Sequence, residues 1–488
     1  MIATRERPAP RQEAAALPFV VVVALAAGPF LSMVDSSIVN VAVPDIARSL
    51  RAPLGDVQWT VSAYLLALSS GLAATAWLSK RFGPRTVFIA GLVGFTAASA
   101  ACALAPSLPF LVAARAAQGL LGAPLTPIAM GVLTTAPGAD RRQGRQAPMI
   151  VMGILLFAGP AAGPTVGGLL IGAFGWPAIF LVNVPFGILG VVGALQWRAE
   201  RAAADPGTRF DPAGMALLAG GLALALYGAG QGPTAGWTAP RVWPFWAAGA
   251  VLVAAYVAWA LRSPHPAVNV RLLGDRMVAT AVTLSVLVSV VSFSAMFLLP
   301  VFMQTVQGYS ALQAGLTLLP QGVVMGLGMF LGQAVGNAGR LRLGALAGTA
   351  ALAVATAAML LIDATTPAWM IALVLCGRGL ASGLATQPLL VTMMGRLRGP
   401  DVADGSTLFN VVQRVAGSFG IGLLATLFAQ RVGERTAAAA QHTPAALRSA
   451  SVAGFHDVVW ALAAVSALGV LVALLVRDGG LEPGPDRE

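Results

Sequence analysis

The sequence predicts an all-α integral membrane protein in which fourteen membrane-spanning helices form two six-helix bundles plus two extra central helices. Only 10% of the 488 residues are charged and 57% are hydrophobic, whereas soluble domains carry about 25% charged residues. Apolar stretches of about 20 residues, the length that a helix needs to cross a bilayer, recur from end to end. Basic residues fall mostly in every second loop, as the positive-inside rule requires.

Each predicted helix is an apolar run that lies between charged or Pro/Gly-containing loops. The expected helices cover residues 18–40, 57–79, 86–105, 108–134, 147–170, 177–196, 212–230, 243–261, 277–304, 311–336, 343–362, 367–394, 405–429 and 454–476.

The loop charges predict the orientation. With the N-terminus in the cytoplasm, most lysine and arginine side chains fall on the cytoplasmic side, and the C-terminus lies there too. The net charge of +11 then faces anionic membrane lipids, so no nucleic-acid partner is needed to explain it. Together with Arg-rich, Lys-poor usage, this indicates the cytoplasmic (inner) membrane of a bacterium.

Two longer loops, residues 196–212 and 261–276, bracket a two-helix insert. Six helices precede the insert and six follow it. The segment AWLSKRFGPR (76–85) resembles GQAVGNAGRLR (332–342), and each follows the second helix of its half, which indicates an internal repeat. The predicted domains are an N-terminal six-helix bundle (1–197), a linker with the two extra helices (198–265) and a C-terminal six-helix bundle (266–488).

Asp35, in MVDSSIVNVAVP, is the one carboxylate placed well inside a predicted span. A charge there costs roughly 2.5–3.5 kcal/mol on insertion scales, so a buried ionisable group is a candidate for function. Desolvation favours a neutral carboxyl group and a neighbouring guanidinium favours the charged one, so movement between two such environments would switch its proton. The alternative is a packing hydrogen bond to a nearby Ser or Asn.

Three arginines also fall inside spans: Arg115, Arg378 and Arg414. Asp35 is the expected partner of Arg115 if the first and fourth helices meet around one cavity, and a structural contact with backbone carbonyls is the alternative. No acid is left for the other two. Packing is favoured for Arg414, while packing and function stay open for Arg378.

The fifth predicted helix contains six glycines and prolines within ten residues. Glycines spaced by four leave a smooth groove on one helix face, and the prolines prevent a regular straight helix. This pattern indicates either a bending, sliding helix or an ordinary small-residue packing face. The six residues are Gly159, Pro160, Gly163, Pro164, Gly167 and Gly168.

An enzymatic function is not expected. His265, His442 and His456 lack the spacing of metal ligands, so no metal site is predicted. No GxxxxGK[ST] phosphate-binding loop is present.

Several motifs resemble those of the fourteen-helix drug:proton antiporters of the major facilitator superfamily. VDSSIVNVAVP resembles the first-helix motif of that family and carries its acid at Asp35. RAAQG (115–119) resembles the fourth-helix motif, GPAAGPTVGG (159–168) the fifth-helix antiporter motif, and FLVNVPFG (180–187) the segment that follows. LPVFMQTVQGYSALQAGLTLLP (299–320) is similar to a segment of the second half.

The resemblance implies a proton-coupled exporter that works by alternating access, with Asp35 and Arg115 in or near the coupling site. The proton gradient would be the energy source, with no cofactor. The cytoplasmic gate loop departs from the family pattern, because Lys80 stands where the family has an acid and Pro84 replaces an arginine. Lys80 thus either alters the usual latch or is one more positive residue on the inner face. The gate-loop residues are Lys80, Arg81, Gly83 and Arg85.

The expected substrate is a lipophilic, amphipathic small molecule such as a drug or antibiotic, and neutral, weakly anionic and monocationic compounds all remain open. Protons and membrane lipids are the other expected partners, and the protein is expected to act as a monomer. A translocase of lipids or lipid-like molecules and a membrane sensor without transport are the alternative functions. Substrate-lining candidates, chosen by depth in their helices, are Trp59, Tyr64, Gln118, Phe157, Met296, Phe297, Gln321, Asn410 and Gln413.

Overall fold

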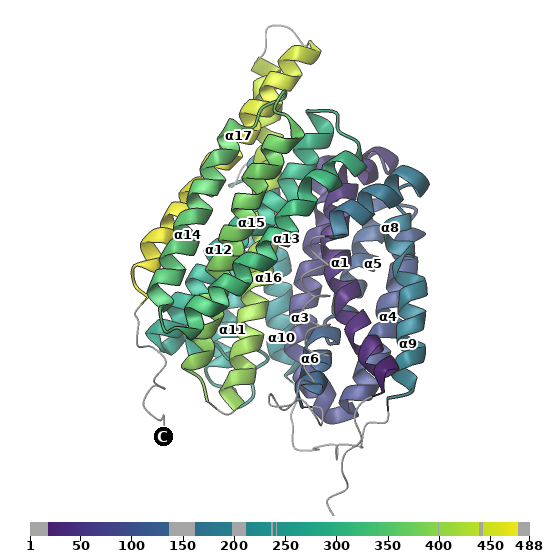
Figure 1. Ribbon diagram of the computed structural model, residues 1–488, viewed down its shortest axis with the longest axis vertical. Helices are drawn as coiled ribbons and strands as arrows, with labels where there is room; N and C mark the ends of the chain where they lie inside the picture. Colours follow the sequence, from purple (N-terminus) through teal and green to yellow (C-terminus); the bar gives the residue numbers. More distant parts are fainter. Residues whose placement is uncertain are drawn as a thin grey trace, which may run out of the picture.

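The computed structural model describes residues 18–135, 162–197, 211–235, 238–240, 242–398, 400–438 and 443–476. These residues form helices and connecting turns, without a strand (Figure 1). Among them are 12 helices long and apolar enough to cross a membrane, and two shorter apolar helices, Ala162–Phe174 and Pro212–Gly228. Each predicted helix overlaps one of these segments, and residues 147–161 of the fifth predicted helix lie outside the described residues. The all-helical membrane fold is confirmed. The predicted domain boundaries remain a prediction.

The first half is built around α1, which crosses the bundle next to α9, α6 and α3. α5 packs between α3 and α4. α1 continues to Ser49 through Pro44, beyond its predicted end. The elements of this half are α1 (Phe19–Ser49), α2 (Leu54–Val57), α3 (Trp59–Phe82), α4 (Pro84–Ala103), α5 (Leu108–Gly122), α6 (Leu125–Thr135), the helix Ala162–Phe174, α8 (Ala178–Leu181) and α9 (Asn183–Leu195).

The extra pair consists of α10 (Pro212–Ala235) and α11 (Trp243–Ala260), which pack on each other. A Cβ at Gly249 would collide with the backbone of Ala225, so glycine permits this close approach. α10 also contacts α3 of the first half and α16 of the second. The pair therefore lies against both halves.

In the second half, α15 packs between α13 and α14, while α16 packs between α12 and α17. The internal repeat has a conformational counterpart, because Gly83 and Gly339 both have a positive φ, 82° and 72°. The elements are η1 (Val270–Gly274), α12 (Arg276–Thr305), α13 (Ala311–Asn337), α14 (Leu341–Ala357), η2 (Ala358–Leu361), α15 (Ala368–Gly395), α16 (Pro400–Ala438) and α17 (Pro444–Ala473).

The two halves meet near the end of the bundle that is predicted to be external. α1 contacts α12, α3 contacts α16, and the helix Ala162–Phe174 meets the start of α13. Among the described residues, five hydrogen bonds cross this contact, which we call the outer seam: Gln58 Nε2 to Thr426 Oγ1 (3.2 Å), Ser62 Oγ to Ser418 O (3.5 Å), Ser418 Oγ to Ser62 O (3.2 Å), Gln304 Nε2 to Val41 O (2.8 Å) and Thr165 Oγ1 to Gly315 O (3.0 Å).

α16 and α17 project beyond the other helices at one end of the molecule (Figure 1). The sequence predicts that the first of these helices ends at residue 429 and that the second begins at residue 454. Instead α16 reaches Ala438 and α17 starts at Pro444, because the alanine-rich segment continues both helices. Arg435 forms an ion pair of 2.6 Å with Asp457 across this projection.

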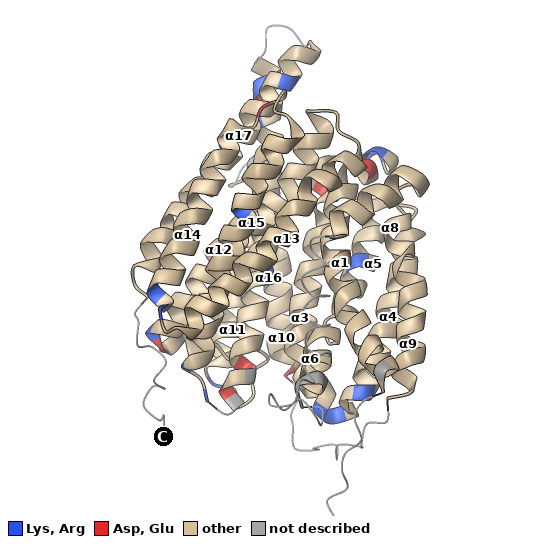
Figure 2. Ribbon diagram, in the orientation of Figure 1, with Lys and Arg blue, Asp and Glu red and all other residues tan. Residues whose placement is uncertain are grey.

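Charged side chains gather at the two ends of the bundle, and few lie between them (Figure 2). One boundary acid, Asp275, caps α12 by accepting hydrogen bonds from the backbone N–H groups of Met277 and Val278. It also pairs with Arg396 at 2.9 Å. Partial burial raises the pKa of Asp275, but the hydrogen bonds from Arg396 and the two backbone groups outweigh it and hold the pKa below its usual value. The start of α12 is thus fastened to the end of α15.

Candidate functional site

Asp35 of α1 and Arg115 of α5 form an ion pair in the interior of the first half. Both side chains are 0% exposed. Burying two charges is costly unless further hydrogen bonds satisfy them. The question is therefore which groups surround the pair.

Three side chains donate hydrogen bonds to the Asp35 carboxylate. Arg115 Nη1 bonds one oxygen. The other oxygen accepts from Gln118 Nε2 at 2.9 Å and from Asn183 Nδ2 at 3.0 Å. Both amides also donate to the hydroxyl group of Ser99, at 2.7 and 3.4 Å. Four elements, α1, α4, α5 and α9, thus converge on one carboxylate.

The Arg115 guanidinium is held by α3 as well. Its Nε donates to the backbone oxygen of Thr60 at 2.9 Å, and its Cζ lies 4.1 Å from the centre of the Tyr64 ring. A Cβ at Gly119 would collide with the backbone of Tyr64, so the glycine one turn after Arg115 allows α5 and α3 to approach closely. Tyr64 in turn hydrogen-bonds Ser32 of α1. The predicted structural contact with a carbonyl and the predicted pairing with Asp35 both occur.

We call Asp35, Arg115, Gln118, Asn183, Ser99, Thr60 and Tyr64 the buried polar cluster. The pairing of Asp35 with Arg115 is predicted from the sequence, and Gln118 and Tyr64 are among the predicted substrate-lining residues. Ser99, Thr60 and Asn183 are not predicted. Asn183 lies within FLVNVPFG, and its amide inside an apolar segment was the available signal.

Two polar atoms of the buried polar cluster lack a hydrogen-bond partner within the described chain. Arg115 Nη2 and Asn183 Oδ1 are buried and have no hydrogen-bond partner among the residues that the structure describes. An unsatisfied buried polar atom costs about 1–3 kcal/mol. While α1 and α5 stay together, Arg115 compensates the charge of Asp35, and any separation of the two helices would take this partner away from the carboxylate. The ion pair therefore joins α1 to α5, and it persists only while these two helices keep their relative position.

The described part of the glycine and proline motif lies between the halves. A Cβ at Gly163 would collide with Ser37 of α1, and one at Gly167 with Ile38. Gly168 approaches the backbone of Ala311 and Leu312 at the start of α13, where no Cβ would fit. The motif thus permits one helix to touch α1 and α13 together. Gly159 and Pro160 lie outside the described residues.

The gate-loop residues lie at the end of α3. Lys80 and Arg81 are exposed, Gly83 ends α3, and Arg85 donates to the backbone oxygen of Leu195 at 2.9 Å. Lys80 also lines a cavity of about 120 Å³ to which Asp211 and Asp404 contribute. In this structure the lysine faces carboxylates from the extra helices and from the second half.

The remaining substrate-lining candidates are dispersed. Met296 and Gln321 line a cavity of about 50 Å³ between the halves, beside Ser37 and Asn40. Phe297 is buried in the apolar core, and the Trp59 ring lies 6.2 Å from that of Tyr227 on α10. Asn410 and Gln413 are half-buried on α16. Phe157 lies outside the described residues.

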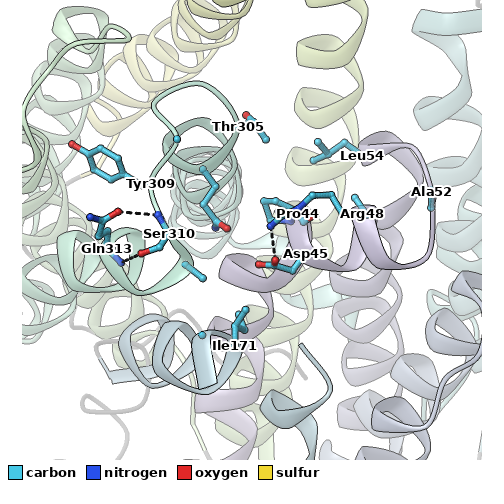
Figure 3. A pocket seen from close by; sticks show the side chains of 15 residues that line it. Pro44, Asp45, Arg48, Ala52, Leu54, Ile171, Thr305, Tyr309, Ser310 and Gln313 are labelled. Atoms are coloured by element: carbon cyan, nitrogen blue, oxygen red, sulfur yellow. Dashed lines mark hydrogen bonds and ion pairs between the residues drawn. The ribbon is translucent and has the colours of Figure 1, made fainter. Parts of the chain in front are cut away.

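A larger cavity of about 860 Å³ opens above the outer seam. Figure 3 shows the Asp45 and Arg48 pair on one side and Tyr309, Ser310 and Gln313 on the other. Its volume is within the range of about 300–1,000 Å³ that is typical of small-molecule sites. Gln304 lines it and also bonds α1 in the seam. We call this cavity the outer vestibule.

The other two arginines in the spans differ from each other. Arg378 is 1% exposed and occupies in α15, the fourth long helix of its half, the place that Arg115 has in α5. It donates to Thr356 Oγ1 at 2.8 Å and to the Val291 backbone oxygen at 3.2 Å, and its Nε has no partner in the described part of the chain. Arg414, which the sequence assigned to packing, is half-buried.

Two helical halves that meet at one end, with an ion pair buried inside one of them, define a polytopic membrane transporter. The chain belongs to the Major Facilitator Superfamily, which it matches over residues 25–421. It is 35% identical to the multidrug resistance protein B homologue of Mycobacterium tuberculosis over 81% of this chain and 74% of that protein. It is 33% identical to the tetracenomycin C resistance and export protein of Streptomyces glaucescens, over 86% and 77% of the two chains.

Solved structures share the fold. A bacterial homologue of the human lysosomal transporter Spinster, in an inward-facing and unoccupied conformation, superposes with a TM-score of 0.65 and 16% identity, covering 94% of this chain and 97% of that one. A D-xylose–proton symporter superposes with a TM-score of 0.64 and 15% identity, over 95% and 99%. Membership of the Major Facilitator Superfamily makes the protein a transporter and not an enzyme, as predicted.

Proposed function

We propose that this protein is a proton-coupled exporter of amphipathic small molecules such as drugs or antibiotics, and that it works by alternating access. The observation that carries the proposal is the ion pair of Asp35 and Arg115, fully buried and bonded by four elements. The resistance and export functions named for its relatives support the direction and the substrate class.

Proton exchange follows from the surroundings of Asp35. With the helices together, the carboxylate keeps its charge because Arg115, Gln118 and Asn183 all donate to it. When α1 shifts against α5 during the rearrangement of the halves, the pair separates and the isolated carboxylate takes up a proton, since a buried unpaired charge is costly. Return of Arg115 expels that proton. Substrate moves in the opposite direction during the same rearrangement.

The protein lies in the bacterial cytoplasmic membrane with both termini in the cytoplasm, acts as a monomer, and uses the proton gradient without a cofactor. The outer seam then closes the external side, and the outer vestibule is the compartment that substrate enters last.

The test is proton release from purified protein in liposomes on addition of candidate amphipathic drugs. Asp35→Asn keeps the size of the side chain and its ability to bond Arg115 but cannot exchange a proton. We expect substrate-dependent proton movement in the wild type and none in Asp35→Asn. Asp401→Asn, which alters an exposed acid in the first turn of α16, should behave as the wild type.

Equal proton movement in the wild type and Asp35→Asn would refute the assignment of coupling to Asp35. Binding of drugs without proton movement in either protein would refute antiport, and would favour translocation of lipids or a sensing role.

A further inference from the structure

Arg414 lies in the middle of α16 with no hydrogen-bond or ion-pair partner in the described chain. It differs in this from Arg115 and Arg378, which are fully buried and bonded to neighbouring groups. Arg414 is only half-buried although it is far from either end of its helix. A guanidinium with five N–H donors is therefore present inside the bundle and still available to a ligand.

The side chain of Arg414 faces the first half. Ser418, one turn later on the same face of α16, donates to the backbone oxygen of Ser62 on α3 at 3.2 Å. Arg414 also lies close enough to Tyr64 of α3 for the two side chains to interact electrostatically. Tyr64 belongs to the buried polar cluster, because Arg115 lies over its ring. Arg414 is therefore next to this cluster.

The charge in this region is positive. Asp35 is the one carboxylate in the buried polar cluster, and Arg115 already neutralises it. Arg414 therefore adds a positive charge that no described acid compensates. A desolvated cation placed here would be repelled and an anion would be attracted, and guanidinium binds carboxylates with two parallel hydrogen bonds.

We propose that Arg414 binds an anionic group of the transported molecule, such as a carboxylate or phenolate, so that the preferred substrates are anionic amphipathic compounds. Asn410, one turn earlier on the same helix face and half-buried, adds an amide next to the guanidinium. This inference rests on the proposed function and narrows its substrate class.

The charge balance has a measurable consequence. Exchange of one inward proton for one outward monoanion moves the equivalent of two positive charges inward. Exchange for a neutral molecule moves one, and exchange for a monocation moves none. A membrane potential that is negative inside therefore drives export of anions most strongly.

The test compares fluorescein, an anionic carboxylate dye, with rhodamine 123, a cationic ester on the same ring system. Wild-type protein in liposomes with an imposed proton gradient should transport fluorescein at least tenfold faster than rhodamine 123. Arg414→Gln should lose that preference by tenfold or more, while Arg414→Lys, which keeps the charge, retains part of it. Arg448→Gln, which removes an exposed arginine from the projecting part of α17, is the matched control and should behave as the wild type.

Proton-coupled transport of rhodamine 123 without fluorescein would overturn the anion assignment and leave the proposed function intact. Unchanged fluorescein transport by Arg414→Gln would overturn it too. Absence of proton-coupled transport of either dye and of every drug tested would overturn both. Should Arg414→Gln fail to fold, the wild-type preference and the Arg414→Lys variant decide the matter.

Discussion

Asn183 and Gln118 donate to one oxygen of the Asp35 carboxylate, while Arg115 bonds the other. Each of these bonds is significant, because a hydrogen bond to a charged group contributes about 1.5–3 kcal/mol to stability. At the residue scale, neutral amides as well as the arginine hold the Asp35 carboxylate in place. Asn183 acts through Asp35 and is therefore a positioning residue.

Asn183→Leu should slow proton-coupled transport by roughly tenfold, because loss of one such bond changes the free energy by at least about 1.4 kcal/mol. Substrate binding at equilibrium should change by less than about twofold. The measurements are transport rates in liposomes and binding in detergent, with Asn337→Leu at the exposed end of α13 as the control. A parallel loss of binding and transport would indicate a general packing defect instead.

At the scale of single elements, one helix of the first half contacts both α1 and the second half. The helix Ala162–Phe174 touches α1 through Gly163 and Gly167, and α13 through Gly168. These contacts require bare backbone, since a methyl group at Gly168 would meet main-chain atoms that cannot move aside alone. The motif thus sets the separation between the two halves at the outer seam.

Gly168→Ala should therefore weaken the outer seam, reduce transport several-fold and increase passive proton leak into liposomes. Gly172→Ala supplies a matched control on the same helix, because a Cβ there meets nothing within 4 Å. Proton flux is measured with a pH-sensitive dye in vesicles that contain each variant. Identical behaviour of the two variants would show that the close contact with α13 is dispensable.

Across the whole molecule, the outer seam is the contact that the proposed alternating access would have to break. Ser62 of α3 and Ser418 of α16 each donate to the backbone oxygen of the other, at 3.5 and 3.2 Å. Their side chains are therefore close enough to be joined covalently. A bond there would hold the external side closed.

We expect the pair Ser62→Cys and Ser418→Cys, in a background without Cys102 and Cys376, to lose transport on oxidation and regain it on reduction. Each single substitution should stay active under both conditions. Transport is followed in liposomes before and after treatment with a reducing agent. Undiminished transport by the cross-linked protein would contradict the movement of α3 against α16.

Much of this architecture follows from sequence, for reasons that differ between its parts. Asp35 and Arg115 stand out because charged residues are rare in the spans. A single acid in the spans is therefore the obvious partner for an arginine. Ser99, Thr60 and Asn183 do not stand out, because a hydroxyl, a backbone carbonyl or an amide in a helix also has local partners. The predicted end of α16 and the predicted start of α17 were wrong. Hydropathy identifies only the part of a helix that lies in the membrane, whereas alanine residues continue the helix beyond it.

The projection of α16 has a practical consequence. A helix of 39 residues is about 58 Å long, nearly twice the thickness of the hydrocarbon core. The last turns of α16, which follow the seam residue Thr426, form with the start of α17 a stiff handle that projects beyond the other helices. An antibody fragment raised against this handle would add recognisable mass for electron microscopy, so that successive conformations of a small membrane protein could be aligned and imaged.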